Sequence, residues 1–167
     1  MRITYFWRMS NIVIRKAKKE DVIDILSLIK ELADFEKGLD QVTVTESDLL
    51  RDGFGKNPLF HALIAENNVE ILGIAVYFYT YSTWNGKTLY LEDLVVSEKS
   101  RSKGIGKLLM DEIIKIGQTQ EVHRISWQVL DWNVKAQKFY KKFEASLDAE
   151  WLNGRLDSAQ IRRFKGK

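Results

Sequence analysis

The sequence has 167 residues, of which 45% are hydrophobic and 29% charged, and its formal net charge is +3. These values are typical of one globular domain spanning residues 1–167, and the slight, dispersed positive charge favours a small anionic ligand over nucleic acid. Because cysteine is absent, disulfides, thiolate metal sites and a cysteine nucleophile are excluded.

No apolar run approaches the roughly 20 residues that cross a bilayer, and the N-terminus lacks the apolar core and cleavage site of a signal peptide. We therefore expect a cytoplasmic protein without a membrane partner. Residues 1–10 form a loose N-terminal extension, or Met9 is the true start of the chain. His61 and His123 have no metal-ligand spacing, so no metal site is expected.

The first half of the chain predicts a strand, two helices and a pair of strands. Alternating side chains indicate a strand at Asn11–Ala17, and a helical apolar stripe indicates a helix over Lys19–Lys37. Thr45 begins a capping box and a second, shorter helix. Phe60–Glu66 and Glu70–Tyr81 then have the pattern of two antiparallel strands joined by a turn.

The next strand, Leu89–Val96, is apolar except for two adjacent carboxylates, Glu92 and Asp93. Side chains alternate along a strand, so unless a bulge intervenes only one of the two can point into a given cleft. Alternation places Glu92 on the face of Leu94 and Val96. The alternative is that one acid is a satisfied structural partner and the other lies at the surface.

A glycine-containing turn follows this strand and opens a helix that extends to Gln118. The turn has the pattern R-x-x-G-x-G over Arg101–Gly106. The first N–H groups of a helix have no internal partner and the helix dipole favours anions, so the turn is suited to phosphate, and Arg101, Lys103 and Lys107 add positive charge. The pattern is neither a Walker loop nor a Rossmann fingerprint, and alone it could be an ordinary helix cap.

The remaining segments complete an α/β fold. Ile125–Leu130 predicts a strand that runs parallel to the carboxylate-bearing strand, because a crossover helix connects the two. Asn133 is a natural N-cap for a helix over Val134–Lys142, and Ala145–Lys167 predicts one or two weak strands and a short helix or frayed tail. The expected architecture is a mixed, mostly antiparallel sheet with helices on both faces.

The last of these helices carries a second group of residues. Asn133, Ala136 and Tyr140 are three and four residues apart, which places them on one helix face. They could serve packing alone, with Asn133 as a cap and Tyr140 in the core. Their position one strand and one loop after the glycine turn makes a functional site the alternative.

Taken together, these motifs resemble the GNAT N-acetyltransferase superfamily. The resemblance is carried, in order, by the strand ending in Leu94–Val96, the R-x-x-G-x-G turn and the N-x-x-A-x-x-F-Y block at Asn133–Tyr140. It is closest to the diamine (spermidine/spermine) acetyltransferase family, and Ser82–Trp84 and Leu130–Asn133 are most similar to the thialysine-acetylating branch. The resemblance extends from about residue 12 to residue 145.

The resemblance implies a splayed parallel strand pair, acetyl-CoA as co-substrate, a small-molecule amine as acceptor and a homodimer. It implies that the cofactor is bound by Leu94, Val95, Val96, Arg101, Ser102, Lys103, Gly104, Ile105, Gly106, Lys107, Asn133, Ala136 and Tyr140. The chain departs from the family at Glu144, where glycine is usual, and in its C-terminal part, which lacks the usual aromatic run.

The resemblance also implies the catalytic and acceptor-binding residues. Glu92 resembles the family's acid and would accept a proton from the acceptor amine, with Asp93 as the alternative base. Tyr140 resembles the residue that donates a proton to the leaving thiolate. Trp84 and Trp127, together with Glu92 and Asp93, would contact the acceptor.

Three functions fit these observations. The first is acetyl transfer from acetyl-CoA to a primary amine of a small cationic acceptor, such as thialysine or a diamine. The second uses an amino acid, a protein N-terminus or a lysine as acceptor, and the third is a CoA-binding regulatory module without turnover, against which the presence of Glu92 and Tyr140 argues. The acids Glu31, Asp34 and Glu36 favour a cationic acceptor, although a solvated helix face also explains them.

Overall fold

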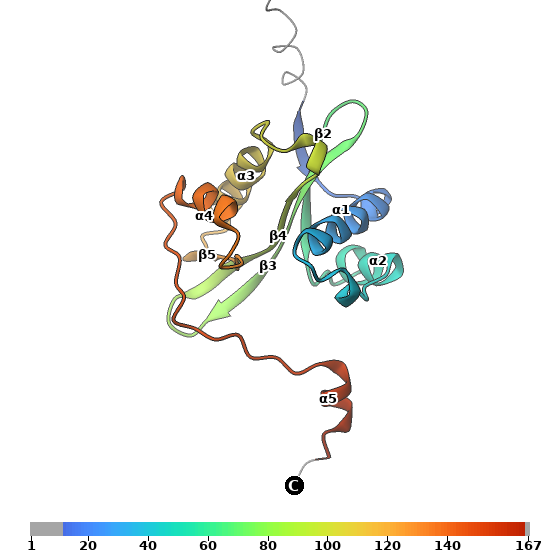
Figure 1. The fold of residues 1–167 in the computed structure, drawn as a ribbon, viewed down its shortest axis with the longest axis vertical. Helices are drawn as coiled ribbons and strands as arrows, with labels where there is room; N and C mark the ends of the chain where they lie inside the picture. Colours follow the sequence, from blue (N-terminus) through green and yellow to red (C-terminus); the bar gives the residue numbers. More distant parts are fainter. Residues whose placement is uncertain (1–11, 166–167) are drawn as a thin grey trace, which may run out of the picture. The chain divides into compact units, whose positions relative to one another are not determined.

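The computed structural model describes residues 12–165 and divides the chain into two compact units, with the boundary between Gln128 and Val129. The first unit contains β1 (Val13–Lys16), η1 (Lys19–Asp21), α1 (Val22–Phe35), η2 (Leu39–Gln41), α2 (Glu46–Phe54), β2 (His61–Glu66), β3 (Ile71–Ser82), β4 (Gly86–Val96), η3 (Glu98–Ser100), α3 (Ile105–Thr119) and β5 (Arg124–Ser126), where η marks a 3-10 turn. The second contains α4 (Val134–Lys141) and α5 (Ser158–Arg163) (Figure 1). No helix among the described residues is both long and apolar enough to cross a membrane.

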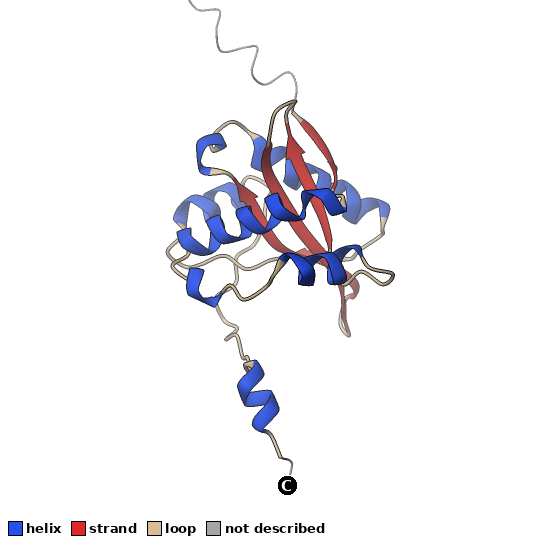
Figure 2. Cartoon of the chain, turned by 90° about the vertical axis from the view of Figure 1, so that its right-hand side faces the viewer, coloured by secondary structure: helices blue, strands red, loops and turns tan. Residues whose placement is uncertain are grey.

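The strands of the described chain form one sheet (Figure 2), and their order in it is β1-β2-β3-β4-β5. Neighbours from β1 to β4 are antiparallel, whereas β4 and β5 are parallel. The parallel pair arises because α3 carries the chain back to the end of the sheet where β4 begins. The predicted α/β class, with a mixed and mostly antiparallel sheet, is confirmed.

Helices cover both faces of this sheet, with α1 and α2 on one face and α3 on the other (Figure 1). On the α1 face, Ile74 of β3 lies opposite Val95 of β4, and both pack with Ile25 of α1 in a buried cluster. Gly73 precedes Ile74 and therefore faces the other side, where a Cβ atom at this position would lie 3.4 Å from Leu109 of α3. The apolar stripes of the two helices thus bury against opposite faces.

A β-bulge interrupts the pairing of β3 with β4. Val76 pairs with Asp93 and Tyr77 pairs with Leu91, so Glu92 is an extra residue in β4. Beyond the bulge the faces exchange, because Leu91 and Asp93 lie on opposite faces although they are two residues apart. The predicted alternation through this strand, which assumed no bulge, is therefore wrong.

Two further predictions are wrong in extent. The strand predicted over Ile125–Leu130 is only β5, which ends at Ser126, because its ladder with β4 stops there. No strand forms in the described residues after 144, where Trp151 and Leu152 are strongly exposed and α5 is the sole regular element. An alternating apolar pattern favours an extended chain, but a strand also requires a partner. The predicted loose extension at residues 1–10 lies outside the described residues.

The turn after α4 explains a departure noted in the sequence. Glu144 has a φ angle of 59°, in the left-handed region. This conformation costs a residue with a Cβ atom about 1–2 kcal/mol, whereas glycine adopts it readily. The turn therefore keeps the backbone geometry that suits glycine, although this chain has glutamate there.

Replacing Glu144 with glycine is expected to stabilise the chain by about 0.5–1 kcal/mol. The gain is smaller than the full relief of strain because glycine also raises the entropy of the unfolded chain. The free energy of unfolding in urea measures it. Glu144→Ala is the matched control, since it removes the side chain but keeps the strained backbone. Equal stability of the two variants would contradict the explanation.

Candidate active site

The strands β4 and β5 part immediately after a short parallel ladder. Only Thr88, Leu89 and Tyr90 of β4 pair with β5, which ends at Ser126, whereas β4 continues to Val96. No other described strand pairs with this side of β4 beyond Tyr90. The splayed parallel pair is therefore present, and it leaves an extended edge of β4 open to an amide-rich ligand.

The two adjacent carboxylates lie at the bulge, close to the point where the strands part. Glu92, the extra residue, is exposed, whereas Asp93 is partly buried and shares the α1 face with Tyr90 and Val95. A bulge re-aims side chains in this way, and bulges are over-represented beside active sites. The structure thus gives the two acids different surroundings.

Burial, followed by the negative charges of Glu92 and Glu36, raises the pKa of Asp93 to about 6. The pKa of Tyr90 is also raised, by burial and then by the charges of Glu92 and Asp93. Desolvation raises the pKa of Glu36, which caps the C-terminal end of α1. The charges of Glu36 and Glu92 thus both act on the partly buried Asp93, whose charged form a nearby cation would stabilise.

The three residues that end β4 present different groups to a ligand. Val95 is 2% exposed and belongs to the core under α1, so only its backbone is accessible to a cofactor. Leu94 and Val96 lie on the α3 face and are partly exposed. A strand-like ligand would therefore use backbone N–H and carbonyl groups here, with the side chains of Leu94 and Val96 beside it.

The turn before α3 has the backbone of an anion site. Ser102 and Gly104 have φ angles of 64° and 81°, and Gly104 is the N-cap of α3. The side chain of Ile105 is buried, but its N–H group and that of Gly106 lie in the first turn, where a helix supplies no carbonyl partner. The turn therefore directs main-chain donors outward at the positive end of the helix dipole.

The basic side chains of this turn contact neighbouring protein groups. The Nε atom of Arg101 donates to the Val96 carbonyl at 3.2 Å, and the Nζ atom of Lys103 donates to the Lys99 carbonyl at 2.7 Å. Lys107 forms an ion pair of 2.6 Å with Asp111. These side chains contribute positive charge around the turn, and main-chain N–H groups supply its directed donors.

In the second unit, the predicted helix and cap are confirmed. The Asn133 side chain accepts a hydrogen bond of 3.1 Å from the Ala136 N–H group and begins α4. Tyr140 is 8% exposed and packs its ring against Phe139, with centroids 5.2 Å apart. Asn133, Ala136 and Tyr140 lie on one face of this helix, and Asn133 does act as a cap.

The two predicted acceptor-binding tryptophans lie in different parts of the first unit. Trp127 is partly buried and directly follows β5, beside the point where β4 and β5 part. Trp84 is 87% exposed in the turn between β3 and β4. Six residues separate Gly86 from Glu92, about 20 Å along a strand, so the structure does not bring Trp84 close to the carboxylates of the same chain.

Glu36 was not among the site residues predicted from the sequence. In the sequence it is one of three acids at the end of the first predicted helix. The structure separates these acids, since Glu31 contacts the loop after β4 whereas Glu36 influences Asp93. No pattern within the helix marks this difference. The described residues contain no cluster of three or more histidine and carboxylate side chains that could hold a metal ion.

Comparison with known proteins defines the class to which this fold and site belong. The acetyltransferase (GNAT) family model matches residues 21–144, and the chain belongs to this family. It is accordingly an acetyl-CoA-dependent N-acetyltransferase, as the resemblance in its motifs implied.

Individual proteins with similar sequences or structures describe the similarity in more detail. The chain is 37% identical over 170 residues to thialysine N-epsilon-acetyltransferase of Sus scrofa, covering 95% of this chain and 100% of that protein. It is 42% identical over 134 residues to spermidine/spermine N(1)-acetyltransferase-like protein 1 of Homo sapiens, covering 76% of this chain and 19% of that protein. An integron cassette protein from V. cholerae has a similar structure, with a TM-score of 0.73, 26% identity and coverage of 92% and 96%. The predicted likeness to diamine acetyltransferases is confirmed.

Proposed function

We propose that the acceptor is the primary amine of a small cationic molecule of the thialysine or diamine/polyamine kind. The observation that carries the proposal is a group of carboxylates beside the parting strands, in which the charges of Glu36 and Glu92 act on the partly buried Asp93. Such a group attracts an ammonium ion and is relieved of its own repulsion when one binds. The names of the two relatives, which align with 95% and 76% of this chain, support the same acceptor class.

Acetyl-CoA is proposed to bind along the open edge of β4 and at the first turn of α3. The N–H groups of Ile105 and Gly106 suit the pyrophosphate, and the backbone of Leu94 and Val96 suits the pantetheine amides, which would pair as an added strand. A main-chain N–H group at the end of β4 would also stabilise the oxyanion that develops on the thioester carbonyl. The bound donor supplies the activated acetyl group.

The acceptor must lose a proton before it attacks. An alkyl ammonium has a pKa of about 10.4, so roughly one molecule in a thousand carries the free amine at neutral pH. Glu92, exposed at the bulge, is the proposed base, acting directly or through water. Asp93 is the alternative, because its pKa of about 6 is close to that of an effective base at neutral pH.

The leaving thiolate requires a proton or a hydrogen-bond donor. Tyr140 is the proposed acid, because a phenol with an ordinary pKa of about 10 is protonated at neutral pH and can donate to the sulfur. Asn133 and Ala136 lie on the same face of α4 and are proposed to contact the cofactor. A homodimer and a cytoplasmic location stay predictions from the resemblance and the composition.

The second candidate keeps acetyl-CoA but uses an amino acid, a protein N-terminus or a lysine as acceptor. The carboxylates attract a lysine side chain as they attract a diamine. The second candidate therefore differs from the first in the size of the acceptor that must fit beside β4. A regulatory module without turnover is not supported, since the named relatives are acetyltransferases.

The test of the acceptor class is the rate of acetyl-CoA consumption with thialysine, lysine, diamines, spermidine and short peptides. We expect kcat/KM for thialysine or a diamine to exceed that for peptides by about tenfold or more, which corresponds to about 1.4 kcal/mol. The Glu36→Gln variant should lose more activity with a diamine than with a monoamine of the same length. Preference for peptides would support the second candidate instead.

Tyr140→Phe is expected to lower kcat by about 10²-fold or more, because general acids contribute roughly 10²–10⁴-fold to rates. Binding of CoA, measured by calorimetry, should change little. Tyr79→Phe, which removes a hydroxyl from a tyrosine of β3, is the control and should retain wild-type turnover. Near-normal kcat in Tyr140→Phe would remove this residue from the mechanism.

The identity of the base is tested by pH profiles of Glu92→Gln and Asp93→Asn. If Glu92 is the base, its variant loses most rate at low pH and with the most basic amines, where free amine is scarcest. A carboxyl with a pKa of about 6 becomes a base only as the pH rises through that value, so a base role for Asp93 requires a rising limb near pH 6. Loss of this limb in Asp93→Asn alone would transfer the role to Asp93.

A further inference from the structure

A carboxylate of α1 contacts the loop that joins β4 to α3. The Oε1 atom of Glu31 accepts a hydrogen bond of 2.6 Å from the backbone N–H group of Glu98, the first residue of η3. The same oxygen accepts from the Nη2 atom of Arg101 at 3.4 Å. Glu31 and Arg101 are each about one-third exposed. One side chain thus joins the start of the loop to the start of the glycine turn.

Glu31 supplies a cap that the loop itself does not provide. Ser97 is the N-cap residue of η3, but its side chain makes no cap hydrogen bond. The N–H group of Glu98 at a helical start needs an acceptor, and a charged acceptor forms a stronger bond than a neutral one. The cap therefore comes from a residue of α1, remote in sequence.

The Arg101 side chain contacts three groups. Besides Glu31, its Nε atom reaches the Val96 carbonyl, and its guanidinium lies over the Phe35 ring, 5.2 Å from the centroid. The next residue, Ser102, has a left-handed φ of 64°, which an L-residue adopts at a cost of about 1–2 kcal/mol. Strained backbone of this kind persists only where the surroundings determine it. Here the residue before Ser102 is held by Glu31 and Phe35 of α1 and by the Val96 carbonyl of β4.

From these contacts we infer that Glu31 is a positioning residue for the turn that binds the pyrophosphate of acetyl-CoA. It acts through Glu98 and Arg101 and does not itself touch the cofactor. The inference rests on the cofactor site proposed above. It assigns Arg101 a role in orienting the N–H groups at the start of α3, in addition to its charge.

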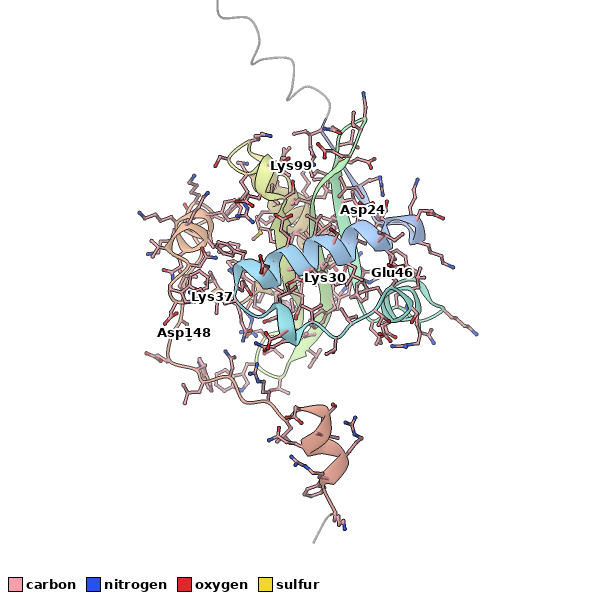
Figure 3. The ribbon with its side chains drawn as sticks, turned by 45° about the vertical axis from the view of Figure 1, so that its right-hand side comes forward. Asp24, Lys30, Lys37, Glu46, Lys99 and Asp148 are labelled. Atoms are coloured by element: carbon pink, nitrogen blue, oxygen red, sulfur yellow. The ribbon has the colours of Figure 1, made fainter. Side chains whose placement is uncertain are left out.

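A second ion pair with the same loop provides a matched control. Lys99 of η3, labelled in Figure 3, forms an ion pair with Glu70 before β3. This pair is more exposed than that of Glu31, and it engages no backbone N–H group of the loop. Exposed pairs of this kind contribute little, so Glu70→Ala removes a carboxylate contact with the loop but leaves the capped N–H group intact.

The test compares Glu31→Ala, Glu31→Gln and Glu70→Ala with the wild type. In Glu31→Ala we expect the Kd for CoA, measured by calorimetry, and the KM for acetyl-CoA to rise about tenfold or more, because a charge-assisted bond is lost. The kcat at saturating donor, with thialysine as acceptor, should change less than about threefold. Glu31→Gln keeps an acceptor for Glu98 and should raise Kd by about threefold, and Glu70→Ala should match the wild type.

A truncated donor separates positioning from general damage to the fold. S-acetylpantetheine lacks the pyrophosphate, so its kcat/KM should be equal in the wild type and in both Glu31 variants. If Glu31→Ala does not fold, the test uses Glu31→Gln alone. This variant is expected to show a raised Kd for CoA and an unchanged kcat/KM for the truncated donor. An unchanged Kd for CoA, or equal losses with both donors, would overturn the inference. Failure of the wild type to bind CoA would instead refute the proposed cofactor site.

Discussion

The rest of the site depends on one additional residue in β4. Because Glu92 has no counterpart on β3, the strand reverses its faces there, and Asp93 and Val95 turn toward α1 while Leu94 and Val96 turn toward α3. The same few residues then lie where β5 has ended. A regular strand would have continued the alternation and carried both the acids and the apolar residues to the opposite faces. The bulge thereby joins an acidic surface and an open strand edge within five residues of chain.

The bulge also places two residues with opposite solvation requirements close together. Val95 needs burial, since it completes the core with α1, whereas its neighbour Asp93 needs water or a counter-charge. The chain does not separate them, and the raised pKa of Asp93 is the result. A buried core residue and a partly buried carboxylate thus lie two residues apart on the same face of β4. An ammonium ion beside Asp93 would relieve this conflict, so the same surroundings that disfavour the charged acid favour a cationic acceptor.

The sequence predicts what depends on local pattern. The stripe on α1, the cap at Asn133 and the glycine turn before α3 follow from periodicity and capping, and the structure has all three. The bulge at Glu92 could not be located, because a bulge depends on the register of two strands and Leu89–Val96 alone fits an unbroken alternation. The end of β5 and the surroundings of Glu36 depend on partners remote in sequence for the same reason.

The helix α1 links the two parts of the site that the first unit contains. Glu31 contacts the loop after β4, and Glu36 influences Asp93 at the bulge. Glu31 and Glu36 are five residues apart, which corresponds to about 7.5 Å along a helix axis. Moreover, Phe35 lies between them and is covered by Arg101. The helix that buries Ile25 against the sheet therefore also contacts the loop before α3 and acts on Asp93, which links the packing of the core to the two regions proposed to bind donor and acceptor.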